Sequence, residues 1–296
     1  RGCGESVGPA GAKLIAVFRS GLVGGWFAVQ AGLAGYGLNT LLGLPLGWSV
    51  VVVGVAFTLL SMAGMQMLKP ISIISICLFI ITGIISVVLN FRHHSWQQVV
   101  DFTPSSGHSL ALGIGVTMAI SVFVDSGTLT ADFTRWSKTP SQAVIASLAA
   151  FPVANTLPML LGGLVAATGE ATDGDFAHLL TQLGPYFGVF AAVFFVINCA
   201  SVATHGLYNA ASGWSSVIPL SFRHLVVLLG IVGTGLALAG ISNWLVNWLS
   251  LLGIIVPGIG GAIIGWMIAG QGRYAPGYLI AGWVFSIICS TFCYLH

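Results

Sequence analysis

The sequence predicts an all-α membrane protein folded as a single bundle of transmembrane helices. Of its 296 residues, 56% are hydrophobic and only 5% are charged, and the mean hydropathy is +0.99. A soluble globular domain carries about 25% charged residues, so this composition excludes that class. Apolar runs recur along the chain at lengths close to the roughly 20 residues that one bilayer crossing needs. The net charge of +2 comes without any basic run, which argues against nucleic acid as a partner.

Clusters of Gly, Pro and charged residues divide the chain into nine apolar segments, which we expect to form one transmembrane domain over residues 1–296. The segments are residues 14–38, 47–66, 70–90, 108–136, 141–168, 186–212, 222–240, 246–269 and 275–294. If the first segment leaves the cytoplasm, eight of the nine Lys and Arg residues fall on the cytoplasmic side and only Arg92 falls outside. This distribution obeys the positive-inside rule. We therefore expect a multi-pass protein of the cell (inner) membrane, acting as a monomer in the lipid bilayer.

The fourth segment, 108–136, contains the most polar stretch inside any span, SVFVDSGTLTADFTRW from Ser121 to Trp136. A carboxylate such as Asp125 costs about 2.5 to 3.5 kcal/mol near the bilayer centre, which makes it a candidate functional residue. Gly127, next to Ser126, allows the backbone to leave helical geometry, and unwound backbone at membrane depth survives only where it is buried or lines a cavity. We therefore expect a broken helix that faces a binding site.

The first segment carries Trp26 and Gln30 one helical turn apart, next to two glycines that allow close approach of a ligand or a helix. An indole can stack on a flat heterocycle, and an amide can both donate and accept a hydrogen bond. The alternative is a packing tryptophan with a glutamine that bonds to a neighbouring helix. The pattern alone leaves both interpretations open.

The sixth segment holds more polar groups than a lipid-facing helix tolerates, and we expect them to face the bundle interior. Asn198 and Ser201 lie one turn apart and offer oxygen atoms suited to a small hard cation such as Na⁺. Thr204 and His205 lie one turn further, and a histidine near a buried carboxylate is typical of a proton relay. A plain interhelical hydrogen bond is the alternative for His205.

Three further patterns have structural or negative interpretations. Asn155 lies between two prolines, which predicts a kink, and the GxxxG pair Gly261 and Gly265 predicts close helix packing. Cys289 and Cys293 share a helix face, but no histidine or acid nearby in the sequence completes a metal site. We expect no resident metal or cofactor beyond a coupling ion. No nucleophile elbow is present, so we expect no enzymatic chemistry.

Several motifs together resemble the nucleobase:cation symporter family, which includes cytosine permeases and hydantoin transporters. The run SGTLTADFTRW up to Trp136 is similar to the sixth helix of the family and the loop after it. Supporting matches are GWF at 25–27, LYNAASG at 207–213 and VPGIGGAIIG at 256–265. The resemblance extends over nearly the whole chain.

The resemblance implies a leucine-transporter-like fold of two inverted five-helix repeats, with substrate held between helices one, three, six and eight. The nine segments correspond to the family's third to eleventh helices, so its first two helices and its last do not lie within this sequence. Trp26 corresponds to the stacking tryptophan, Gln30 to a glutamine one turn later, and Phe123 to an opposing aromatic residue. Asn198 and Ser201 correspond to the part of the sodium site on helix eight.

The chain also departs from the family pattern. Val23 and His205 stand where cytosine permeases carry amides, and Val202 stands where a second sodium-binding hydroxyl is common. Asp125 replaces a small residue, and with His205 it could couple transport to H⁺ or bind a substrate nitrogen.

We therefore expect import of a nucleobase or similar planar heterocycle by symport with Na⁺ or H⁺. The alternatives are a transporter of the same fold for another solute, such as hydroxymethylpyrimidine, allantoin or an amino acid, and a truncated form that does not transport.

Overall fold

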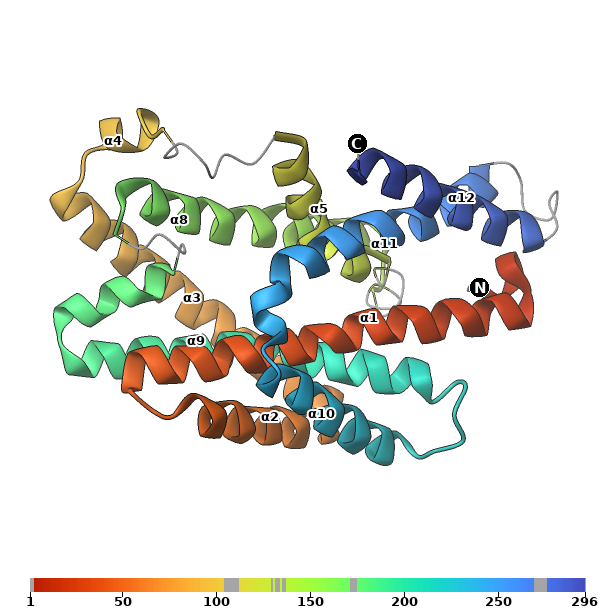
Figure 1. The fold of residues 1–296 in the computed structure, drawn as a ribbon, viewed down its shortest axis with the longest axis horizontal. Coiled ribbons are helices and arrows are strands. Elements are labelled where there is room, and N and C mark those ends of the chain that lie inside the picture. The colour runs from red at the N-terminus through yellow and green to blue at the C-terminus, as the bar shows by residue number, and fades with distance from the viewer. Residues whose placement is uncertain are drawn as a thin grey trace.

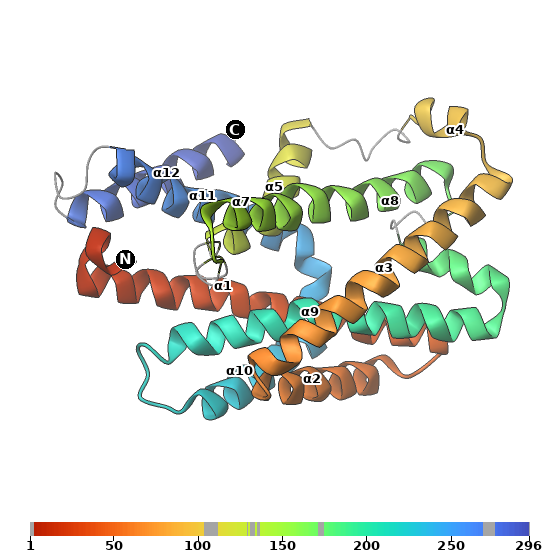
Figure 2. The ribbon, with the colours of Figure 1, turned by 180° about the vertical axis from the view of Figure 1, so that it is seen from behind.

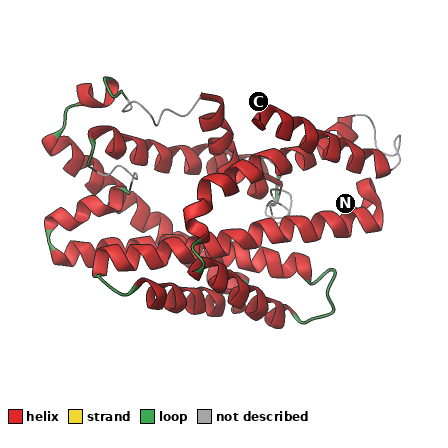
Figure 3. Ribbon diagram, viewed as in Figure 1, coloured by secondary structure: helices red, strands yellow, loops and turns green. Residues whose placement is uncertain are grey.

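The structure is a computed structural model that describes residues 3–103, 112–128, 130, 134, 137–170, 175–268 and 276–295. Within these ranges every regular element is a helix (Figure 3). The elements are α1 (Cys3–Leu42), α2 (Leu46–Met62), α3 (Met65–His93), α4 (Trp96–Val100), α5 (Leu112–Thr128), α7 (Pro140–Leu148), η1 (Ala149–Val153), α8 (Ala154–Thr168), η2 (Phe176–Leu183), α9 (Pro185–Trp214), α10 (Phe222–Leu238), η3 (Ile241–Trp244), α11 (Leu245–Ile268) and α12 (Pro276–Leu295).

The helices occupy all nine apolar segments of the sequence. Five are long and apolar enough to cross a membrane: Lys13–Leu42, Gln66–His93, Pro140–Thr168, Pro185–Trp214 and Ile241–Ala262. Four shorter apolar helices, Leu46–Met62, Gly113–Val124, Phe222–Leu238 and Ile280–Phe292, coincide with the remaining segments. The all-α membrane bundle is thereby confirmed, whereas the number of crossings and their direction stay predictions.

Helices α1 and α9 lie side by side through the middle of the molecule. On one side of this pair are α2 and α10, and on the other are α5, α8, α11 and α12 (Figures 1 and 2). Small residues bring the central pair together, because a Cβ atom on Gly206 of α9 would lie 2.9 Å from the carbonyl oxygen of Val23. Phe27, Phe57 and Leu207 are almost fully buried in the core beside this contact.

Local signals explain where several helices begin and end. The Thr139 hydroxyl accepts a hydrogen bond from the backbone amide of Gln142 at the start of α7, with Pro140 in the first turn. The Asp175 carboxylate likewise accepts from the backbone amide of Ala177. Asp175 thereby caps the start of η2. Gly169 ends α8 with a φ of 81°, a conformation that glycine adopts without strain.

The fourth segment differs from the expected broken helix. Helix α5 continues through Asp125, Ser126 and Gly127 to Thr128, so the prediction of unwound backbone is wrong for these residues. A glycine inside a helix costs only about 1 kcal/mol, so Gly127 is compatible with a continuous helix. The hydroxyl of Ser121 is satisfied within the helix, where it donates to the Thr117 carbonyl at 2.6 Å.

The irregular backbone lies in the next helix instead. Residues Ala149–Val153 form a π-helical turn that contains Pro152, and this turn joins α7 to α8. Proline removes a backbone donor, and π-helical turns occur frequently at functional sites. The Asn155 amide donates to the carbonyl of Ala119 at 3.3 Å. The kink expected at Asn155 therefore lies against α5.

Candidate functional site

Trp26 lies where α1 meets α5 and α11. Its half-buried ring packs against an apolar cluster formed by Leu22 of α1 with Leu249, Leu252 and Val256 of α11. Residues Met118, Val122 and Val124 of α5 and Trp248 of α11 pack against the same cluster. Helices α5 and α11, each more than 80 residues away from Trp26 in the sequence, therefore pack against the same cluster as its ring. This is the kind of junction between helices that holds ligands in bundles.

The buried indole nitrogen of Trp26, Nε1, has no hydrogen-bond partner among the described residues. The same is true of Nε1 of Trp248. A buried donor without an acceptor costs about 1–3 kcal/mol, and such groups are rare in folded proteins. Gln30, one turn along α1, is half-buried. This junction therefore offers hydrogen-bonding groups that the described chain leaves unused.

The predicted residues of α5 are distributed over more than one face. Val122 and Val124 pack toward Trp26, whereas the ring of Phe123 lies edge-on to that of Phe151, with ring centroids 6.1 Å apart. Phe123 thus contacts the π-helical turn, and an aromatic sandwich with Trp26 remains a prediction.

The rest of the predicted α5 set is only partly described. The side chain of Asp125 lies outside the described residues. Ser126 is half-buried, and Gly127 is exposed with open space on its side-chain side.

Two polar residues of α9, Thr204 and His205, bond to backbone carbonyls of their own helix, whereas Asn198 and Ser201 contact α3. Thr204 is fully buried and its hydroxyl donates to the Ala200 carbonyl at 2.6 Å, so it is used within its own helix. His205 Nδ1 lies 2.7 Å from the Ser201 carbonyl oxygen. Because a carbonyl oxygen only accepts, Nδ1 carries the proton of a neutral ring and Nε2 keeps a free lone pair. His205 can therefore accept a proton or a hydrogen bond at Nε2.

Asn198 and Ser201 both reach across to α3. The Asn198 amide donates to the hydroxyl of Ser75 at 3.2 Å, and the hydroxyls of Ser201 and Ser72 are 3.2 Å apart. Four side-chain oxygens from two helices are thus grouped along one contact. Oxygen atoms are the ligands that hard cations such as Na⁺ prefer.

The serines of α3 were not found by the sequence reasoning, although a signal was present. Polar residues recur at helical spacing along this otherwise apolar helix, and most of them are buried: Ser72, Ser75, Thr82, Ser86 and Asn90. In a membrane helix, such a stripe predicts a face turned to other helices rather than to lipid.

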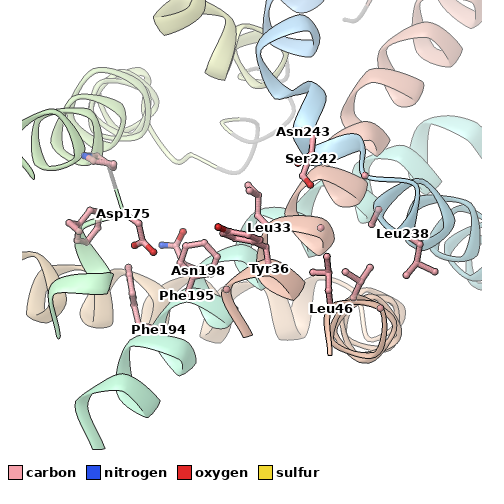
Figure 4. A pocket seen from close by; sticks show the side chains of 18 of the residues that line it. Leu33, Tyr36, Leu46, Asp175, Phe194, Phe195, Asn198, Leu238, Ser242 and Asn243 are labelled. Atoms are coloured by element: carbon pink, nitrogen blue, oxygen red, sulfur yellow. The ribbon is translucent and has the colours of Figure 1, made fainter. Parts of the chain in front are cut away.

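A cavity of about 710 Å³ lies further along α1, beyond Gln30. Its walls include the aromatic residues Tyr36, Phe79, Phe176, Phe194 and Phe195 and the polar residues Asp175, Asn198, Ser242 and Asn243. Figure 4 shows Asp175, Asn198 and Tyr36 gathered at one part of the cavity, with Ser242 and Asn243 above them. Asn198 therefore belongs both to the contact with α3 and to the cavity wall. The size is typical of small-molecule pockets.

Comparison with known proteins identifies the family. Residues 3–277 match the sequence model of permeases for cytosine/purines, uracil, thiamine and allantoin. The chain belongs to this permease family. It is 28% identical over 274 residues to cytosine permeases of Escherichia coli strains K12 and O157:H7, a match that covers 91% of this chain. The matched region spans 63% of the length of these relatives. The family resemblance inferred from SGTLTADFTRW is confirmed, and this permease-family chain is a multi-pass membrane protein.

Proposed function

We propose that this protein is a secondary active transporter of a nucleobase or a related small planar heterocycle. The observation that carries the proposal is the match of residues 3–277 to a family of permeases for such compounds. The cytosine permeases among its relatives make a pyrimidine the first substrate to test. The protein would act as a monomer in the cell (inner) membrane, and it would move its substrate without covalent chemistry.

The junction of α1, α5 and α11 supports a binding site for a flat ring. Trp26 offers an aromatic face and Gln30 an amide one turn away, both half-buried. Stacking on an aromatic ring is worth about 0.5–1.5 kcal/mol beyond burial. Phe123, Asp125, Ser126 and Gly127 on α5 remain the proposed opposite wall.

Two routes of ion coupling are proposed, one for each candidate ion. For Na⁺, the ligands would be Asn198 and Ser201, with Ser72 and Ser75 of α3 close enough to take part. For H⁺, the carriers would be His205, through its free Nε2, and Asp125. The cavity lined by Tyr36 and Asp175 would then serve as the path between the membrane surface and the site.

Uptake into proteoliposomes tests the proposal. We expect accumulation of radiolabelled cytosine or uracil under an inward Na⁺ or pH gradient and none without a gradient. Allantoin, hydroxymethylpyrimidine and a neutral amino acid serve as competitors, because they separate the main proposal from a transporter of the same fold with another substrate. Absence of uptake and of binding for every compound in the set would overturn the proposal.

A further inference from the structure

Trp248, near the start of α11, carries a second buried indole donor at the junction. Its ring lies directly on Gly25 of α1, the residue before Trp26. A Cβ atom on Gly25 would overlap the six-membered ring of Trp248, with Cη2 only 2.6 Å away. Any larger residue at position 25 would push the indole off α1. The glycine therefore fixes the ring of Trp248 beside Trp26.

The described residues around Trp248 offer its Nε1–H no acceptor. Its Nε1 is buried and unpartnered within the described ranges, and so is Nε1 of Trp26. The cluster that both rings pack against is built from the apolar residues Leu22, Leu249, Leu252 and Val256. Two unpaired donors in one apolar junction, at about 1–3 kcal/mol each, indicate that the acceptor arrives with a ligand.

We propose that Trp248 is a specificity-determining residue, whose Nε1–H donates a hydrogen bond to a carbonyl oxygen on the edge of the bound heterocycle. This inference rests on the proposed function and deepens it, since it narrows the substrate to rings that carry a carbonyl group. A carbonyl oxygen projects beyond the ring edge and has two lone pairs. A site whose buried donor needs such an acceptor rejects analogues that lack it.

The same helix region provides a matched control. Trp244, four residues earlier and at the end of η3, is 65% exposed. It has the same indole group in the same segment but stands outside the apolar junction. Replacement of Trp244 therefore reports any general effect of losing a tryptophan here.

The experiment measures equilibrium binding of cytosine and of 4-aminopyrimidine, which keeps the six-membered ring and the amino group, lacks the carbonyl oxygen and offers only ring nitrogens as acceptors. The purified protein is compared with Trp248→Phe and Trp244→Phe. We expect Trp248→Phe to weaken cytosine binding by about five- to tenfold, the value of one hydrogen bond, and to leave 4-aminopyrimidine binding unchanged. Trp244→Phe should bind both compounds as the unmodified protein does.

A second pair of variants keeps the test valid if phenylalanine destabilises the fold. Incorporation of 3-benzothienylalanine at position 248 retains the ring shape and replaces N–H by sulfur, and it should reproduce the selective loss. Gly25→Ala should also weaken cytosine binding, because it displaces the indole. Unchanged cytosine binding in the position-248 variants, or an equal loss for both compounds, would overturn the role of Trp248. If the unmodified protein binds no heterocycle at all, the proposed function fails together with this inference.

Discussion

The two faces of α1 contrast in how they meet their neighbours. Toward α9 and α10 the helix is packed closely: Phe27 is fully buried, and Gly206 of α9 lies against the backbone of Val23. Toward α5 and α11 the contact is made by large rings, and two indole donors have no acceptor within the described chain. The first face has the properties of a scaffold and the second those of a binding site. The adjacent residues Phe27 and Trp26 therefore have different surroundings.

The largest expected effect comes from overfilling the closely packed face. Gly206→Leu should destabilise the protein by about 3 kcal/mol or more, because the new side chain must enter space occupied by the backbone of α1. Thermal unfolding in detergent measures the loss. The control is Gly261→Leu, since an ideal Cβ atom at Gly261 has nothing within 4 Å. A similar loss in both variants would contradict the explanation that close packing at Gly206 causes the effect.

The comparison of Gly206 with Gly261 also shows what the sequence alone predicts. The GxxxG pair Gly261 and Gly265 predicts close packing, yet an ideal Cβ atom at either residue has nothing within 4 Å, so the prediction is wrong within the described residues. Close packing occurs instead at Gly206, which has no neighbouring glycine, and at Gly25, where the close neighbour is the ring of Trp248. Composition and apolar run length determine where helices form. Which glycine faces a neighbour depends on the mutual rotation of helices, which a short motif does not encode.

The candidate site, like the fold, could be predicted from the sequence only where the signal lies within one helix. Trp26 and Gln30 can be selected as candidates from one turn of one helix, and the two prolines beside Asn155 favour irregular backbone such as the π-helical turn at Ala149–Val153. The position of irregular backbone depends on tertiary contacts: unwinding was expected at Gly127, where α5 stays helical, whereas a π-helical turn forms at Ala149–Val153. Trp248 could not be found, because its significance arises only where α11 meets α1. The α3 serines could have been found from their helical spacing.

A smaller effect is expected at the contact between α3 and α9. If Na⁺ binds there, Asn198→Ala should abolish the increase in melting temperature that Na⁺ produces, while loss of the hydrogen bond to Ser75 should cost only about 1 kcal/mol. Thermal unfolding with NaCl and with choline chloride measures both effects. Ser212→Ala, an exposed position on α9, is the control. An unchanged Na⁺ response in Asn198→Ala would exclude this residue as a ligand.

The smallest effect is expected where the C-terminal ends of α3 and α8 meet. The hydrogen bond from His94 to the Glu170 carboxylate, 2.8 Å long, holds the pKa of Glu170 below its ordinary value of 4.5. Burial opposes this shift, whereas a hydrogen bond from Gln182 and the charges of His94 and His93 favour it. Because the folded carboxyl has the lower pKa, its contribution to stability is present above about pH 4.5 and is lost as the pH falls through the folded pKa.

The variant Glu170→Gln should therefore lose under about 1 kcal/mol at pH 7 and should show a weaker decline of stability below pH 4.5. Chemical unfolding at pH 7 and at pH 3.5 measures the difference. Asp101→Asn is a suitable control, because the Asp101 carboxylate is exposed and its nearest hydrogen-bond donor is the Gln97 amide one turn away. An identical pH dependence in the variant and the unmodified protein would contradict a role for this contact.

The most direct test compares the two consecutive residues Trp26 and Phe27 of α1, whose rings pack against different helices. Cytosine binding and thermal unfolding are measured for Trp26→Ala and Phe27→Ala. We predict that Trp26→Ala weakens binding at least about tenfold, the value of roughly 1.4 kcal/mol from lost stacking and hydrogen bonding, and lowers the melting temperature less than Phe27→Ala does, because Trp26 is only half-buried. Phe27→Ala should lower stability by about 3–5 kcal/mol while the folded fraction binds cytosine normally. Unchanged binding in Trp26→Ala, in a protein that otherwise binds cytosine, would contradict the assignment of the α5- and α11-facing side of α1 as the site.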